Sequence, residues 1–345
     1  MSGAARRLLW MAAMVLGLHV AGAGLLALAL AGPVSAATAL GVGTGVTAYT
    51  LGLRHAFDAD HIAAIDNVTR RLRGDGHPSS AVGLAFSLGH SSVVLLLTVS
   101  LALGGGLLVD QLSSDGSVLH EITGTLGPLV SGLFLLGIGA LNVVALRSTV
   151  RALRAVRRGE RSVDAAGPRG PLLRLLARPI AAVDRGWKMY PLGFLFGLGF
   201  DTATEVGLLV LAGSGVAAQL PLWAVLSLPL LFAAGMSLMD TLNGVVMDAA
   251  FGWSTGDRIR RLRYDVTITS LSVAVAVGVG VVELAGTLGG QVDALPDLVR
   301  DVGAADVAAA GYALAALSLA VWGVAALAAR RARYQRTSAW DRSEA

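Results

Sequence analysis

The chain contains no cysteine, and this absence excludes disulfide bonds and thiolate metal ligands. Charged residues make up only 14% and aromatic residues only 6% of the 345 positions. No phosphate-binding motif of the form GxxxxGK(S/T) occurs, so the sequence offers no loop of that kind for ATP. The zinc-protease motif HExxH is missing as well. What the chain has instead is a 54% share of hydrophobic residues, arranged in long runs.

These apolar runs predict a polytopic membrane protein of the all-α class. A helix needs about 20 mostly apolar residues to cross the hydrocarbon core of a bilayer. Such segments satisfy their own backbone hydrogen bonds, and the runs lack the alternation of barrel strands. We expect eight transmembrane helices in a single transmembrane domain that comprises residues 1–345. They are predicted near residues 9–31, 40–65, 81–104, 124–146, 189–212, 220–248, 267–288 and 305–329.

Lysine and arginine orient this bundle, because cytoplasmic loops of membrane proteins carry an excess of basic residues. Here the basic residues gather in the N-terminus, in the loops 66–80, 147–188 and 249–266, and in the tail from Arg330. Both termini are therefore predicted to be cytoplasmic, with 147–188 as a long basic loop. We attribute the net charge of +4 to this topology and to contact with the lipid bilayer, and we expect no nucleic-acid partner.

The first apolar segment has a second interpretation. Its basic start and its ending in "PVSAA" are similar to a secretory signal peptide, but its apolar core is longer than such peptides usually have. We expect an uncleaved first helix, whereas cleavage would leave seven spans. In both cases the sequence predicts a multi-pass protein of the cell (inner or plasma) membrane.

The stretch "GLRHAFDADHIAAIDN" is unusual for a membrane helix, because it is rich in ionisable groups. Each Asp or Arg at the centre of such a helix costs roughly 2.5–3.5 kcal/mol on insertion scales, so Arg54, Asp58 and Asp60 need compensating partners. On a regular helix His55, Asp58 and His61 fall within about 120° of one another and face one cavity, and Arg54 can pair with Asp58. Asp60 then serves a neighbouring helix, orients a ligand from behind, or marks a local unwinding. The alternative is an internal ion-pair network that only locks the bundle.

Other predicted spans carry polar side chains at similar depth. His90 lies in the third span, Asp201 and Glu205 lie one turn apart in the fifth, and Asp240 lies in the sixth. Imidazole and carboxylate ligands without thiolates suit a borderline divalent cation such as Ni²⁺, Co²⁺ or Zn²⁺, whereas Mg²⁺ prefers oxygen alone. The residues alone therefore predict a site for a divalent transition-metal ion.

Four of these stretches resemble motifs of the nickel/cobalt transporter family, a group of eight-helix secondary permeases. The second-helix signature, His, four residues and then Asp-His, appears as His55 through Asp60-His61. "LGHS", "LGFDTATE" and "GMSLMDT" match the motifs of the third, fifth and sixth helices. The sixth-helix motif usually has Asp where this chain has Asn243, which leaves the site one negative charge short. The resemblance implies a metal site of His55, Asp58, Asp60 and His61, followed by His90, Asp201, Glu205, Asp240 and Asn243.

The resemblance also implies that the chain is a permease and not an enzyme. It would take Ni²⁺, Co²⁺ or both into the cell as transported substrates, without a cofactor and without an ATPase partner. The membrane potential could drive this uptake, since a divalent ion gains about 4.6 kcal/mol across 100 mV. An exporter of the same metals is the alternative, because no residue fixes the direction of flux, and a membrane metalloenzyme is a second alternative. A weak similarity between "LGLRHAFDAD" and "FGLGFDTATE" further suggests an inverted repeat.

Overall fold

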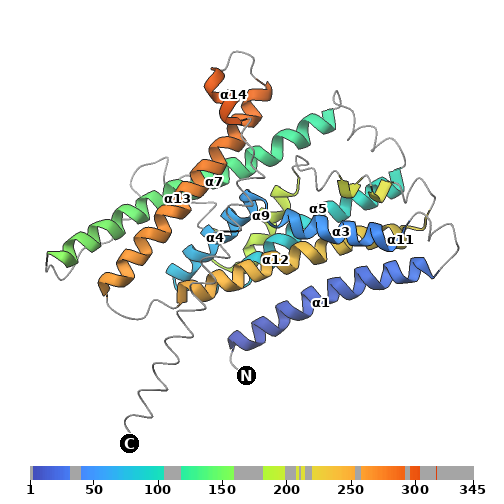
Figure 1. The fold of residues 1–345 in the computed structure, drawn as a ribbon, viewed down its shortest axis with the longest axis horizontal. Coiled ribbons are helices and arrows are strands. Elements are labelled where there is room, and N and C mark those ends of the chain that lie inside the picture. The colour runs from blue at the N-terminus through green and yellow to red at the C-terminus, as the bar shows by residue number, and fades with distance from the viewer. Residues whose placement is uncertain are drawn as a thin grey trace, which may run out of the picture.

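The computed structural model consists of helices and short connections in the residues that it describes, which are 3–31, 40–104, 118–158, 182–198, 207–209, 211–213, 220–252, 258–291, 296–303 and 316. In chain order the elements are α1 (Gly3–Leu30), α3 (Val42–His55), α4 (Ala59–Gly74), α5 (Val82–Gly104), α7 (Val118–Arg157), the 3₁₀ helix η1 (Gly186–Lys188), α9 (Met189–Phe196), α11 (Leu222–Val225), α12 (Ser227–Gly252), α13 (Arg258–Gln291) and α14 (Asp297–Gly303). No strand occurs in these ranges, which confirms the all-α class. In Figure 1, α3, α5 and α12 lie between α1 on one side and the paired α7 and α13 on the other.

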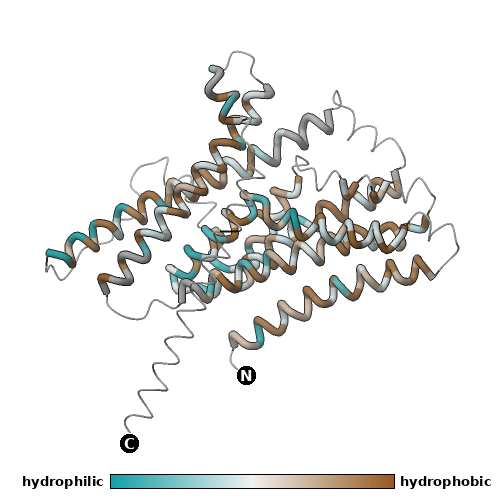
Figure 2. Tube along the Cα trace, viewed as in Figure 1, coloured by the Kyte–Doolittle hydropathy of each residue, from teal (hydrophilic) through white to brown (hydrophobic). Residues whose placement is uncertain are grey.

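In the part of the chain that the structure describes, five helical segments are long and apolar enough to cross a membrane by length and composition. They are Gly3–Leu30, Val82–Leu103, Pro128–Arg157, Leu222–Ala249 and Asp265–Gly289. Large apolar side chains point outward from α1, where Leu9 is 59% and Leu16 is 63% exposed. Figure 2 shows hydrophobic residues along most of α1 and polar residues at α4 and at one end of α7. An apolar outer surface of this kind fits lipid and identifies a membrane protein.

Most of the predicted spans correspond to described helices. The first, third, fourth and seventh correspond to α1, α5, α7 and α13, and the sixth corresponds to α11 and α12 together. Of the fifth predicted span, 189–212, the structure describes α9 and two short pieces nearer its end. The eighth, 305–329, lies outside the described residues apart from Ala316.

Two predicted loops are shorter than the sequence indicated. The basic loop was expected from residue 147, but α7 continues to Arg157. The loop 249–266 was also placed too widely, because α12 ends at Gly252 and α13 begins at Arg258. Arg, Leu and Ala favour helix in water as in lipid, so these helices continue past the point where the apolar run stops. The short helix α14 was not predicted.

Polar contacts hold α4 against the α7–α13 pair. The side-chain amide of Asn142 in α7 donates a 2.5 Å hydrogen bond to Oδ1 of Asn67. Arg70 donates to the same oxygen at 3.1 Å. On α13, the hydroxyl of Ser272 donates to Asp66 at 2.9 Å. The bonds from Asn142 and Ser272 fix α4 in place beside two long helices, and α4 carries His61 of the site described below.

Glycines allow two helix pairs to approach closely. A Cβ atom on Gly52 of α3 would collide with the carbonyl oxygen of Phe232 in α12, and one on Gly235 would lie 2.5 Å from the carbonyl oxygen of Tyr49. The pair α5 and α9 is built in the same way, since a Cβ on Gly89 would collide with the carbonyl of Tyr190 and one on Gly193 with that of Phe86. Small residues at such positions let membrane helices pack backbone to backbone.

The two contacts share one local sequence pattern. Each of the four helices contributes an aromatic residue followed three positions later by glycine: Tyr49 and Gly52, Phe86 and Gly89, Tyr190 and Gly193, Phe232 and Gly235. In each contact the glycine of one helix faces the carbonyl of the aromatic residue on the other. A two-fold relation between the second and fifth predicted spans, and between the third and sixth, would produce this arrangement, as the suggested inverted repeat requires.

We expect Gly52→Ala to destabilise the protein, because its methyl group would force α3 away from α12. Overpacking of this kind costs about 1–3 kcal/mol. Gly43→Ala on the same helix is the matched control, since a Cβ there meets nothing within 4 Å. The measurement is thermal unfolding of both variants in detergent. Equal melting temperatures for the two variants would contradict the close approach of α3 and α12.

Candidate metal centre

The second predicted span is not one helix. α3 ends at His55 and α4 begins at Ala59, with Ala56, Phe57 and Asp58 between them. Asp58 has an extended backbone conformation (φ −64°, ψ 143°) at the N-cap of α4. The prediction of a continuous helix over 40–65 was therefore wrong: a local unwinding is present, and it lies just before Asp60, which is itself helical.

Charged side chains stabilise the two helix ends at this break. Arg54 lies in the last turn of α3, and Asp60 lies in the first turn of α4. The helix dipole is negative at the C-terminus of a helix and positive at the N-terminus. A cation therefore stabilises the C-terminus, and an anion stabilises the N-terminus. Neither glycine nor proline marks the break in the sequence, so only the order of the charges signals it.

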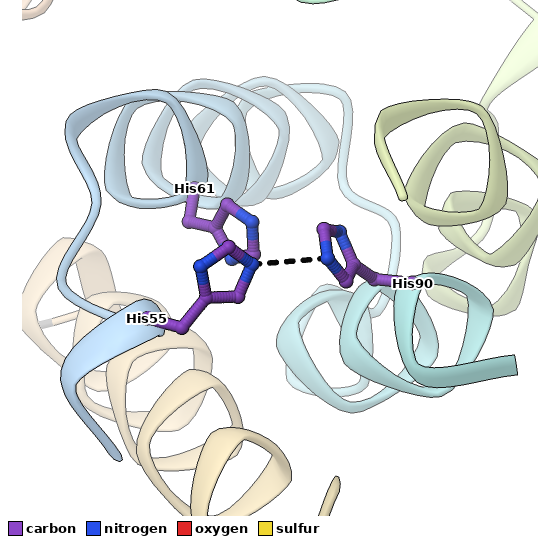
Figure 3. A group of neighbouring side chains, drawn as sticks. All are labelled: His55, His61 and His90. Carbon is purple, nitrogen blue, oxygen red and sulfur yellow. Dashed lines mark hydrogen bonds between the residues drawn. The ribbon is translucent and has the colours of Figure 1, made fainter. Parts of the chain in front are cut away.

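Three histidines converge at the break. His55 comes from the end of α3, His61 from the first turns of α4 and His90 from α5, as Figure 3 shows. One ring nitrogen from each lies within 4.8 Å of the others, and the Nε2 atoms of His55 and His90 are 2.9 Å apart. All three side chains are buried, with at most 2% exposure. Nitrogen atoms grouped at such distances can bind one metal ion in common.

Asp58 lies behind His55. Its Oδ2 atom is 2.8 Å from Nδ1 of His55, and its Oδ1 atom is 3.5 Å from a guanidinium nitrogen of Arg54. The predicted pairing of Arg54 with Asp58 is thus present. A carboxylate at Nδ1 favours the imidazole tautomer whose Nε2 carries a lone pair, and it holds the ring in one orientation. Asp58 therefore orients a histidine in this structure and does not face the cluster beside it.

Asp240 of α12 lies next to the cluster, and Asn243 follows it by three residues on the same face of that helix. Oδ2 of Asp240 is 3.7 Å from Nδ1 of His61. Asp240 is completely buried and Asn243 is 8% exposed. Within the described residues, neither carboxylate oxygen of Asp240 and neither polar atom of the Asn243 amide has a hydrogen-bond partner. Buried polar atoms normally have partners, so this group fits a site that a cation and its bound water complete.

Two phenylalanines enclose the cluster, and the sequence analysis did not identify them. The ring centroids of Phe86 and His61 are 4.8 Å apart, and those of Phe232 and His55 are 5.5 Å apart. The backbone carbonyls of the same two residues take part in the aromatic-glycine contacts described above. The close packing of the helices therefore also places the rings beside the site. An apolar wall keeps water from the ligands and strengthens their interaction with a cation. Phe86 could have been found from its position one helical turn before His90.

The remaining predicted site residues lie elsewhere. Asp60 is half-buried in the first turn of α4 and does not belong to the group of three histidines. Asp201 and Glu205 lie outside the described residues. The structure thus brings together His55, His61 and His90 from three helices, with Asp58 at Nδ1 of His55 and Asp240 3.7 Å from Nδ1 of His61.

Fold and site together define a class: a helical membrane protein with a buried imidazole and carboxylate centre suited to a divalent transition-metal ion. The family model described as "High-affinity nickel-transport protein" matches residues 41–328, and the chain belongs to this family. By its description the family comprises transporters, which agrees with the expectation of a permease. The resemblance stated from the four motifs is therefore confirmed.

Characterised relatives extend over most of the chain. The nickel transporter NicT of Mycobacterium tuberculosis is 47% identical over 296 residues, which are 84% of this chain and 79% of that protein. The nickel transporter NixA of Staphylococcus aureus is 43% identical, with 83% and 84% of the two chains covered. The cobalt transport protein NhlF of Rhodococcus rhodochrous is 42% identical, with 76% and 75% covered. No solved structure matches the chain significantly.

We expect His90→Ala to weaken Ni²⁺ binding by more than about tenfold, since even the loss of an indirect metal contact has an effect of about that size. His77→Ala is the control, because His77 is exposed in the connection between α4 and α5. Calorimetric titration of both detergent-solubilised variants measures the change, and their melting temperatures show that each is folded. Unchanged affinity in a folded His90→Ala protein would exclude His90 from the site.

Proposed function

We propose that this protein is a secondary transporter that takes Ni²⁺, Co²⁺ or both into the cell across the plasma membrane. The observation that carries the proposal is the buried cluster of His55, His61 and His90 at a helix break. An interrupted helix within the membrane is a common way for transporters to build an ion site, because the break frees side chains and backbone at mid-depth. The relatives that are named nickel and cobalt transporters support the choice of metal.

The ligand chemistry also favours these metals. Imidazole nitrogen binds Ni²⁺, Co²⁺ and Zn²⁺ well and binds Mn²⁺ and Mg²⁺ less well. We assign His55, His61 and His90 as the direct ligands, with Asp240 and Asn243 as further contacts to the ion or to its water. Asp58 and Asp60 act from the break itself, Asp58 through His55. Asp201 and Glu205 stay predicted contributors from the fifth span.

The topology that we propose has eight transmembrane helices in one permease domain of residues 1–345. The α3–α4 unit forms the second span, although the break divides it into helices of 14 and 16 residues. Both termini and the basic segment 147–188 face the cytoplasm, since lysine and arginine concentrate there. In this orientation α4 leads from the histidine cluster to the cytoplasmic surface.

The membrane potential is the proposed driving force. A divalent ion that moves alone across 100 mV gains about 4.6 kcal/mol, which corresponds to an accumulation of roughly a thousandfold. The proposal therefore needs neither a cofactor nor an ATPase partner, and the only partners are the metal ion and the bilayer. In this proposal the metal ion is the transported substrate and not a resident cofactor, because the site must release the ion that it binds.

Two other functions would use some of the same residues. An exporter of Ni²⁺ or Co²⁺ could have the same ligands, and only a flux measurement separates it from an importer. A membrane metalloenzyme would need an open coordination position beside a group that activates substrate. Phe86 packs against His61 and Phe232 packs against His55, and an apolar wall beside two of the ligands favours transport of the ion over chemistry on a bound substrate.

Metal entry into liposomes tests this function. The purified protein, reconstituted with known orientation under an inside-negative potential, is expected to admit Ni²⁺ and Co²⁺ at least about tenfold faster than Mn²⁺. Entry should occur from the face opposite the basic loops. His61→Ala in the same vesicles is the control for uptake through the cluster. Faster entry of Zn²⁺ or Mn²⁺, or metal movement only outward, would overturn the importer proposal.

Asn243→Asp is expected to change metal selectivity. A carboxylate would add one negative charge beside Asp240 and His61, so Ni²⁺ and Co²⁺ should bind more tightly and their affinity ratio should shift. Thr241→Ser serves as a conservative control on the same turn of α12. Competition of Co²⁺ against labelled Ni²⁺ measures the ratio. Identical competition curves for Asn243→Asp and the parent protein would place Asn243 outside the site.

A further inference from the structure

A row of polar side chains follows the contact between α4 and α12 away from the histidine cluster. The two helices pack against each other, and the contact begins where His61 meets Asp240 at 3.7 Å. Between this contact and the Arg73–Asp248 pair, helical spacing places Thr69 on the side of α4 that carries His61 and Arg73, and Asn243 on the side of α12 that carries Asp240. It ends where Arg73 of α4 meets Asp248 of α12. We call this row, from Asp240 through Asn243 and Thr69 to Asp248, the α4–α12 seam.

The middle of the seam is polar but incompletely hydrogen-bonded. Thr69 is completely buried, and its hydroxyl has no hydrogen-bond partner among the described residues. The same is true of both polar atoms of Asn243 and both carboxylate oxygens of Asp240. Each unpartnered buried polar group costs about 1–3 kcal/mol, so a purely structural helix contact would avoid them. Hydroxyl, amide and carboxylate oxygens can bind a partly hydrated cation for a short time as it moves past them.

The far end of the seam is closed by ionic contacts. A guanidinium nitrogen of Arg73 donates to Oδ1 of Asp248 at 2.7 Å, and the hydroxyl of Ser79 donates to the same oxygen at 2.5 Å. These contacts connect α4, the segment before α5, and α12. The side chains of Arg73 and Asp248 are 41% and 22% exposed, so the pair lies at the surface end of the bundle. An exposed ion pair is weak and reversible, which suits a closure that opens during transport.

We propose that the α4–α12 seam is the path by which the metal ion leaves the histidine cluster toward the cytoplasm, with Asn243 and Thr69 as intermediate contacts. The Arg73–Asp248 pair, with Ser79, is the gate at its inner end. The proposal rests on the proposed function for its cargo and orientation. Arg73 suits a gate because its positive charge repels a cation while the ion pair is closed. When the pair opens, the carboxylate of Asp248 becomes available to the cation.

Accessibility of a single cysteine tests the gate independently of transport. The natural chain has no cysteine, so Thr69→Cys supplies the only thiol. Inside-out membrane vesicles expose the cytoplasmic face to a membrane-impermeant methanethiosulfonate reagent. Labelling of Thr69→Cys should be slow, and adding Arg73→Gln should speed it by about fivefold, which is the effect expected from losing a partly exposed ion pair.

Two further variants separate a gate from general loosening. Arg71→Gln removes the same charge two residues away, where Arg71 pairs with Asp75 at the C-terminal end of α4 at 3.7 Å, so labelling should stay slow. The exchange Arg73→Asp with Asp248→Arg restores an ion pair across the seam and should restore slow labelling. Denatured protein labelled in full shows that the thiol is reactive in every variant.

The outcomes discriminate between the ideas. Equal labelling rates with and without Arg73→Gln, no labelling of either, or the same increase with Arg71→Gln would overturn the gate. Labelling from the outer face alone would contradict the proposed orientation. If labelling followed the expected pattern while liposomes took up no metal, the gate would stand and the proposed function would fail.

Discussion

The structure depends on one constraint: polar groups placed inside an apolar helix bundle must find partners within the protein. The stretch around the α3–α4 break contains two histidines, an arginine and two aspartates in the eight residues from Arg54 to His61. Ending one helix and starting another there turns these charges toward helix ends of opposite polarity. The same interruption lets His55 and His61 turn toward His90 on a third helix.

Close helix packing makes this arrangement possible. Gly52 brings α3 against α12 three residues before His55, and Gly89 brings α5 against α9 directly before His90. The positions of both histidines are therefore set by backbone contacts and not by flexible side chains. Phe86 and Phe232, which belong to the same contacts, cover the imidazole rings. Packing and site thus use the same residues, and a change in helix separation would change the distances between the ligand nitrogens.

The carboxylates near the cluster differ in their surroundings. Asp58 is held between His55 and Arg54, so its charge is balanced and its role is to orient a ring. Asp240 is completely buried, and its Oδ2 atom is 3.7 Å from Nδ1 of His61, which is beyond hydrogen-bond distance. That contrast separates a carboxylate that positions a ligand from one that can interact with a passing ion. Further buried polar atoms without hydrogen-bond partners, in Asn243 of α12 and Thr69 of α4, extend from the site toward one end of the bundle.

The sequence by itself determined the helical membrane class and the family, and it named nine candidate site residues that include His55, His61 and His90, because hydropathy and motif spacing are properties of single segments. It did not reveal the break after His55, since apolar periodicity continues through Ala56 and Phe57 and no glycine or proline interrupts it. Only the tertiary structure decided that Asp58 supports His55, that Asp240 approaches His61, and that Phe86 and Phe232 enclose the rings. These contacts join residues on different helices, and their distances follow from backbone packing at glycines that no single segment can specify.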